Sequence, residues 1–382
     1  MRRILCGLLL AVLGLSLPVY AAAAEPEAAG KSAVLMDVTT GTLLQQSNAH
    51  EKLAPASVTK VMTMLLIMEA VDSGKIALTD MVTASETAAA KGGSQIYLKV
   101  GETMPVSDML KSIAVSSAND CACAMAEHIA GSEAAFVTMM NARAAQLGMQ
   151  DTHFVNCTGL DDGPEAANHR TSAYDIALMS RELLKKHPTI KNYTTIWMDT
   201  VRNGTFGLSN TNKLIRFYPG ATGLKTGFTS GAGYCLSATA ERDGMELIAV
   251  VMGAETSQSR NAACKQLLDY GFANYALVCP ELTEVSDVPV SLGKQTSVRP
   301  MLGDESAMLV DKGQKNAITT EFFLEESLPA PVSRGQRVGT LTMKAGEQVL
   351  KEIPLVAAEG VERLSWGDIF VGVLKRAAMA KG

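Results

Sequence analysis

The spacing of apolar residues changes along the chain and predicts helices in some regions and strands in others. An unbroken apolar run over residues 61–68 follows Pro55 and predicts a helix that starts near Ser57 and stops before Gly74. A helix that is apolar on every side belongs in the middle of a large domain. Apolar spacing predicts further helices over residues 106–114, 121–130, 133–147 and 171–184.

Strand patterns lie on both sides of this helical region. Residues 32–45 predict a β-hairpin, and strand patterns return after Gly223, where Asp243 and Gly244 mark a tight turn. A helix over residues 261–275 follows. We therefore expect an α+β fold, in which helices flank an antiparallel sheet and a helical lobe is inserted between its strands. Such a fold places a cleft at the boundary between lobe and sheet.

The last third of the chain has a different residue pattern. Short β-branched runs alternate with turn residues from Pro280 to about residue 360, which predicts a small all-β sandwich. An amphipathic helix is predicted after it, with an apolar face made by Trp366, Ile369, Phe370, Val373, Leu374 and Ala377. The expected parts are a signal peptide at 1–24, a main domain at 25–279, a sandwich at 280–362 and the helix at 363–382.

The N-terminal segment has the features of a secretory signal peptide. Two arginines, a short apolar stretch and four consecutive alanines precede Glu25, and the stretch is short for a membrane span. A retained N-terminal anchor is the alternative. We expect a mature start near Glu25, with the net charge going from −5 to −7 when Arg2 and Arg3 are lost. This acidic balance gives no support to nucleic-acid binding.

The cysteines and histidines form no metal-binding pattern. Cys6 lies in the signal segment, and the other six of the seven cysteines include no CxxC pair, so buried free thiols are expected. The five histidines are scattered, without HxH or HExxH spacing. We expect neither a metal site nor a cofactor.

Candidate chemistry begins where the buried helix begins. Ser57 and Lys60 are three residues apart, which places both side chains on one helix face. A lysine can take the proton of a serine hydroxyl only when burial or a second cation lowers its pKa. The spacing alone is weak evidence, because Ser291 and Lys294 repeat it in a region predicted as strand and loop.

Two further motifs follow in the chain. Ser117 and Asn119 are predicted on a loop between two helices, where polar side chains can point into a cleft. Lys225, Thr226 and Gly227 come later, in the first strand of the second strand-rich region. The pattern of Ser117 and Asn119 also occurs at residues 259–261, but there it lies after the Lys-Thr-Gly.

The order of these three motifs resembles that of the serine penicillin-recognising enzymes. Residues 154–160, 169–175 and 233–235 add a similarity to low-molecular-mass penicillin-binding proteins of the D-alanyl-D-alanine carboxypeptidase type. The resemblance covers residues 32 to about 275 and extends more loosely to the sandwich and the C-terminal helix. This family usually has Gly between its Ser and Asn, where the chain has Ala118.

The resemblance implies a peptidase reaction with an acyl-enzyme. Ser57 would attack the carbonyl between two D-alanines, Lys60 would take the serine proton, and Ser117 would relay a proton to the leaving amine. The backbone N–H groups of Ser57 and Phe228 would form the oxyanion hole. The substrate-binding residues implied by the motifs are Asn119, Lys225, Thr226, Gly227 and Phe228.

The implied partners are a peptidoglycan stem peptide ending in D-Ala-D-Ala and β-lactams as covalent inhibitors. A membrane surface is a third partner, bound by the C-terminal helix. The protein would then act after export, at the outer face of the cytoplasmic membrane or in the periplasm.

Two other functions are compatible with parts of the pattern. A class A β-lactamase shares the three motifs, and Glu165 to Asn168 superficially resembles its additional glutamate motif, but the spacing is a residue short. A catalytically silent wall-binding scaffold is the second alternative, disfavoured by the intact motifs. Whether the enzyme also cuts D,D-crosslinks stays open, since both reactions use the same residues.

Overall fold

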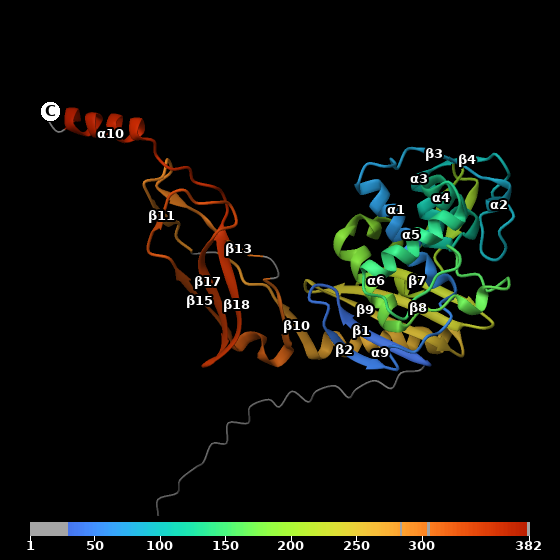
Figure 1. Ribbon diagram of the computed structural model, residues 1–382. Coiled ribbons are helices and arrows are strands. Elements are labelled where there is room, and N and C mark those ends of the chain that lie inside the picture. Colours follow the sequence, from blue (N-terminus) through green and yellow to red (C-terminus); the bar gives the residue numbers. More distant parts are fainter. Residues whose placement is uncertain (1–29, 283–284, 304–305, 380–382) are drawn as a thin grey trace, which may run out of the picture.

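The structure is a computed structural model that describes residues 30–282, 285–303 and 306–379. The predicted signal peptide at 1–24 and the mature start near Glu25 lie outside the described residues. The described chain forms two bodies, one built around a sheet with helices on both faces and one built from strands alone, with a terminal helix beyond (Figure 1).

A five-stranded antiparallel sheet organises the larger body. The strand order is β2-β1-β9-β8-β7, so strands from the start of the chain pair with strands more than 170 residues later. Alternate residues of one strand face two different cores, with Val34 in one and Leu35 in the other. The strands are β1 (Ser32–Asp37), β2 (Leu43–Ser47), β7 (Ala221–Thr229), β8 (Gly233–Arg242) and β9 (Met245–Ala254).

Helices cover both faces of this sheet. One face carries the larger core and the helical lobe, and α9 (Ser257–Asn274) packs on the other (Figure 1). The main helices of the lobe side are α1 (Lys60–Asp72), α3 (Val106–Ser116), α4 (Asn119–Ala130), α5 (Glu133–Gln146) and α6 (Ala173–Lys186). Residues 61–68 of α1 are all buried, as the continuous apolar run predicts. The predicted α+β fold with an inserted helical lobe is confirmed.

Several short elements complete the larger body. They are α2 (Glu86–Ala89), α7 (Lys191–Thr194) and α8 (Leu214–Phe217), and two antiparallel strand pairs, β3 (Met81–Thr83) with β4 (Thr103–Pro105) and β5 (Met198–Val201) with β6 (Phe206–Ser209). Neither strand pair was predicted from the sequence. Strands of three or four residues are too short to show an alternating pattern.

The second body is the predicted small all-β sandwich. A three-stranded sheet, β12-β11-β16, and a four-stranded sheet, β13-β18-β17-β15, share one apolar core. Its strands are β11 (Val288–Ser291), β12 (Ser297–Val298), β13 (Pro300–Leu302), β15 (Ile318–Leu324), β16 (Leu328–Pro329), β17 (Arg337–Ala345) and β18 (Gln348–Ala357).

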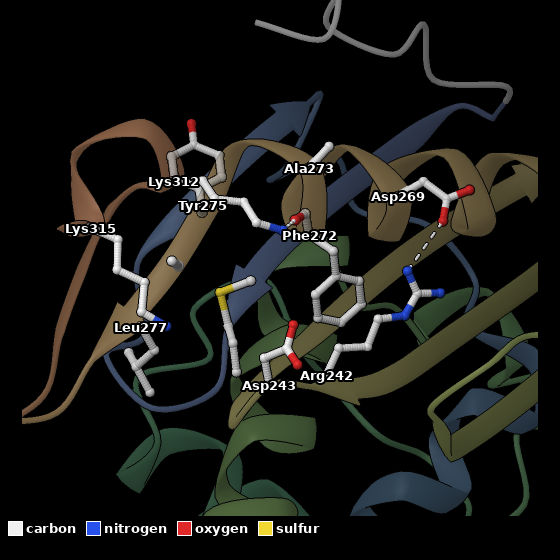
Figure 2. A pocket seen from close by; sticks show the side chains of 11 residues that line it. Arg242, Asp243, Asp269, Phe272, Ala273, Tyr275, Leu277, Lys312 and Lys315 are labelled. Atoms are coloured by element: carbon white, nitrogen blue, oxygen red, sulfur yellow. Dashed lines mark hydrogen bonds and ion pairs between the residues drawn. The ribbon is translucent and has the colours of Figure 1, made fainter. Parts of the chain in front are cut away.

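A two-stranded ribbon connects the two bodies. Strand β10 (Tyr275–Val278) leaves α9 and pairs with β14 (Met308–Asp311) of the second body. A cavity of about 370 Å³ lies at this junction (Figure 2). Arg242 lies over the rings of Phe272 and Tyr218, and Lys312 Nζ donates to the Phe272 carbonyl at 2.8 Å.

The C-terminal helix α10 (Trp366–Met379) lies away from the larger body (Figure 1). Among its described side chains, Trp366, Phe370, Val373 and Leu374 are exposed, Trp366 at 88%. Among the described residues, no helix combines the length and the apolar character needed to cross a membrane. The six cysteines outside the signal segment are free thiols, buried as expected except for Cys279.

Candidate active site

Ser57 lies on a strained turn that leads into α1. The turn is a 3₁₀ helix over Ala56–Thr59, and Lys60 is the first residue of α1, so Ser57 precedes the α-helix rather than lying in its first turn as predicted. Ala56 has a φ of 48°, a conformation that a residue with a side chain rarely adopts. The predicted proximity still holds, because Lys60 Nζ lies 2.9 Å from Ser57 Oγ.

Lys60 is fully buried, with 0% of its surface exposed. Its amine contacts Ser57 Oγ and donates to the Thr158 carbonyl at 2.7 Å. Burial lowers the pKa of Lys60 to about 7, although the nearby Cys157 and Asp120 act to raise it. A substantial fraction of Lys60 is therefore a neutral amine at neutral pH, as a general base must be.

The loop at residues 156–160 closes over Lys60. Asn156 Oδ1 accepts from the backbone N–H groups of Thr158 and Gly159, which folds the loop into a tight turn. Gly159 has a φ of 82°, and a Cβ built on it would lie 1.8 Å from the Ala56 carbonyl oxygen. Only glycine lets this loop approach the nucleophile turn so closely. The sequence analysis noted this stretch only as a family similarity.

Ser117 and Asn119 lie at the junction of two helices. Ser117 has a φ of 63° directly after α3, and Asn119 is the first residue of α4, not a loop residue as predicted. Asn119 Nδ2 donates to the Gly92 carbonyl at 2.7 Å. Ser117 Oγ and Asn119 Oδ1 are both buried without a hydrogen-bond partner. Buried polar atoms of this kind are the ones a ligand can satisfy.

Lys225 and Thr226 come from edge strand β7. Lys225 is 1% exposed and its Nζ donates to the Thr226 carbonyl at 2.9 Å, while Thr226 Oγ1 donates to Thr211 Oγ1. Burial lowers the pKa of Lys225 well below its ordinary value, and the charges of Lys60 and Arg260 lower it further. Of the two causes considered above for a lowered pKa of Lys60, burial and a second cation, burial is the one that lowers it.

Gly227 and Phe228 continue the same strand along the nucleophile turn. A Cβ on Gly227 would lie 2.8 Å from the Pro55 carbonyl oxygen and 3.0 Å from the Val58 nitrogen. Phe228 is 55% exposed and its ring stacks on Tyr234 at 4.3 Å, so its side chain faces solvent.

Arg260 is a site residue that the sequence analysis missed. It extends from α9, is 5% exposed, and donates to the Asn261 side chain and the Cys235 carbonyl. No carboxylate of the described chain forms an ion pair with it, and burial lowers the pKa of its guanidinium. A single arginine inside a helix gives no sequence signal. Residues 259–261 match the Ser-x-Asn pattern, but in the wrong order relative to the Lys-Thr-Gly motif, so they were set aside.

Two cavities near the site share Leu160 and Ala166 in their linings. One of about 190 Å³ lies along the nucleophile turn and the end of β7, and one of about 420 Å³ lies between residues 87–92 and 155–166. The smaller one is lined by Ala56 and by Thr229 of β7, so a cavity adjoins the turn that carries Ser57.

Two other residues noted in the sequence, Lys294 and Glu165, do not contact Ser57 or Lys60. Lys294 is in the second body, where it forms an exposed ion pair with Glu362 at 2.6 Å. Glu165 is exposed and accepts from the Asn168 side chain at 2.6 Å, without a contact to Ser57 or Lys60. The structure thus offers no carboxylate at this position that resembles the β-lactamase glutamate.

Comparison with known proteins decides the family. Residues 20–256 match the D-alanyl-D-alanine carboxypeptidase family of serine peptidases, and residues 280–363 match the C-terminal domain of penicillin-binding protein 5. The chain belongs to the D-alanyl-D-alanine carboxypeptidase family. This membership favours the carboxypeptidase over the class A β-lactamase and the silent scaffold.

Individual relatives support the same assignment. The chain is 43% identical to the D-alanyl-D-alanine carboxypeptidase DacF of Bacillus subtilis over 98% of both chains. The crystal structure of penicillin binding protein 5 from Haemophilus influenzae is similar with a TM-score of 0.72 and 31% identity, covering 89% of this chain and 99% of that one. Penicillin-Binding Protein D2 of Listeria monocytogenes, in its ampicillin-bound form, is similar with a TM-score of 0.57 and 30% identity, covering 65% of this chain and 100% of that one.

Replacement of Gly227 tests the contact between β7 and the nucleophile turn. Gly227→Ala places a methyl group against backbone atoms that cannot move aside, so we expect labelling by a fluorescent penicillin to fall at least about tenfold. Gly231→Ala is the matched control, because its methyl group meets only the Asp161 side chain at 3.5 Å. Equal labelling of both variants would contradict the close approach.

Proposed function

We propose that this protein removes the terminal D-alanine from peptidoglycan stem peptides through an acyl-enzyme on Ser57. The observation that carries the proposal is the buried Lys60 amine, with a pKa of about 7, at 2.9 Å from Ser57 Oγ. A buried amine of this kind can activate a hydroxyl at neutral pH. Family membership supports the same reaction.

The reaction would begin with attack of Ser57 Oγ on the carbonyl between the two D-alanines. Lys60 takes the hydroxyl proton, and the backbone N–H groups of Ser57 and Phe228 stabilise the oxyanion. The C–N bond then breaks, Ser117 relays a proton to the leaving amine, and D-alanine departs. Water hydrolyses the ester and regenerates Ser57. The unpartnered Ser117 Oγ supports the relay, because it is free to bond with substrate.

The substrate carboxylate would bind where the site's cations gather. Lys225 and Arg260 are buried and interact, without a carboxylate partner among the described residues, and Thr226 follows Lys225 on β7. A bound carboxylate favours the charged form of Lys225. A charged Lys225 in turn disfavours protonation of Lys60, so binding of the substrate carboxylate helps keep the base neutral.

Two other residues would align the peptide. Asn119 can accept from the substrate amide through its free Oδ1 while Gly92 holds its amide nitrogen. Gly227 lets the backbone of β7 run close to the scissile bond.

Penicillin labelling tests the nucleophile, since the ampicillin- and cefotaxime-bound forms of the Listeria relative suggest β-lactams as inhibitors here too. We expect a long-lived adduct of one penicillin per chain by intact mass, and release of D-alanine from a peptide ending in D-Ala-D-Ala. Ser57→Ala should lose both while keeping its circular dichroism spectrum. Rapid penicillin turnover would indicate a β-lactamase, and absence of any adduct a scaffold.

The pH dependence of acylation tests the base. Because the pKa of Lys60 is lowered to about 7, the neutral form is lost as the pH falls through that value. The acylation rate constant should therefore decrease about tenfold per pH unit below about pH 7 and level off above it. Stopped-flow measurement with a chromogenic penicillin gives the profile. A rate that stays constant between about pH 5 and about pH 8 would contradict the role of Lys60.

We also propose that the protein is exported and attached to the membrane surface. The proposed parts are the signal peptide at 1–24, the catalytic domain at 25–279, the β-sandwich at 280–362 and the helix at 363–382. The exposed apolar side chains of α10, including Trp366, Phe370 and Val373, support the attachment.

Removal of the C-terminal helix tests the attachment. Deletion of residues 364–382 should move the protein from the membrane fraction to the soluble fraction, because it removes the exposed apolar face. The triple substitution Trp366→Ser, Phe370→Ser and Val373→Ser in the full-length chain should also move the protein to the soluble fraction. Membrane association that persists in both variants would refute the proposal.

A further inference from the structure

A carboxylate outside the reaction centre contacts both loops that border the site. Glu133 is the first residue of α5, and its side chain is 18% exposed. Its Oε2 accepts from Lys91 Nζ at 2.6 Å. Its Oε1 accepts from the backbone N–H and from Sγ of Cys157, each at 3.2 Å. Glu133 therefore ties the segment around Lys91 to the segment around Cys157.

The segment around Cys157 holds the carbonyl that Lys60 contacts. The backbone N–H of Cys157 donates to Glu133, and its backbone carbonyl accepts from Thr63 Oγ1 at 2.6 Å. Thr158 is the next residue, and its carbonyl accepts from Lys60 Nζ at 2.7 Å. The position of the Thr158 carbonyl thus depends on how Cys157 is held.

The segment around Lys91 contacts Asn119. Gly92 follows Lys91, and its carbonyl accepts from Asn119 Nδ2 at 2.7 Å. A Cβ on Gly93 would lie 2.8 Å from the same Nδ2, so the segment fits closely against the amide. The Lys91–Glu133 ion pair therefore holds the backbone that orients Asn119.

We propose that Glu133 is a positioning residue for the acylation step, because it fixes the Thr158 carbonyl and through it the direction of the Lys60 lone pair. A neutral amine has two N–H bonds and one lone pair. When one N–H is held by the Thr158 carbonyl, the lone pair can be directed at the Ser57 hydroxyl. The inference rests on the proposed role of Lys60 as the general base.

The same loop keeps water away from Lys60. The titratable groups around this amine are Asp120 of α4, Cys157 of the loop, Lys225 of β7 and His169. Those around Glu133 are Lys91, Cys123 and Cys157. If the loop loosens, water reaches Lys60 and its pKa moves up toward the ordinary value. A direct effect of losing the negative charge of Glu133 has the opposite sign, since it would lower the pKa of Lys60.

The experiment compares Glu133→Ala and Glu133→Gln with a matched control in the full-length protein. Glu182→Gln removes a carboxylate that is 21% exposed and pairs with Arg143 at 2.7 Å, away from both loops. The readouts are the acylation rate constant for a chromogenic penicillin as a function of pH, and KM and kcat for a D-Ala-D-Ala peptide. Titration with penicillin gives the active fraction.

We expect Glu133→Ala to lower the acylation rate constant about 10²-fold, with kcat falling far more than KM changes. The acid limb of its pH profile should move to higher pH. Glu133→Gln keeps an acceptor for the Cys157 N–H and should recover part of the rate, and it carries the test if the alanine variant does not fold. Glu182→Gln should keep the wild-type profile.

Three results would overturn the inference. The first is that the acylation rate constants of both Glu133 variants follow the wild-type pH profile after correction for active fraction. The second is that the acid limb of a Glu133 variant moves to lower pH. The third is an equal shift in Glu182→Gln, which would indicate a general loss of stability. A wild-type profile without an acid limb near pH 7 would refute the general-base role of Lys60 itself, and the inference with it.

Discussion

The exclusion of water from Lys60 is the constraint on which the site depends. Relative to an exposed lysine, lowering the pKa from 10.5 to about 7 corresponds to about 5 kcal/mol of bias against the charged form. That bias requires the amine to be shielded from water. The buried helix α1, the loop at residues 156–160 and strand β7 enclose it.

The surrounding polar groups are arranged for a ligand rather than for one another. Ser117 Oγ and Asn119 Oδ1 are buried without partners, and within the described part of the chain Lys225 and Arg260 form no ion pair with a carboxylate. Unsatisfied polar atoms and clustered cations lower the stability of a site without ligand. In the proposed reaction, a peptide with a free C-terminal carboxylate would satisfy them together, which would couple recognition of the chain end to activation of the base.

The sequence predicts best what is encoded locally. The apolar run of α1, the alternation in the sheet and the Ser-x-x-K, Ser-x-Asn and Lys-Thr-Gly motifs all lie in contiguous residues, and the structure brings Ser57, Lys60 and Lys225 together. Arg260 and Glu133 could not be predicted, because their surroundings come from distant segments. The strained backbone at Ala56 was missed for the same reason, since it is packed closely against Gly159 and Gly227 from two distant segments.

The ribbon between the two bodies has a mechanical consequence. Antiparallel strands β10 and β14 form a strip two strands wide, and Lys312 fastens its base to the end of α9. A strip of hydrogen-bonded strands resists bending within its own plane but flexes across its face. Leu277 and Leu309 of the ribbon pack against a core of the larger body, and Val278 and Met308 pack against the core of the sandwich. The same two strands therefore belong to both cores and tie the position of the sandwich to that of the sheet.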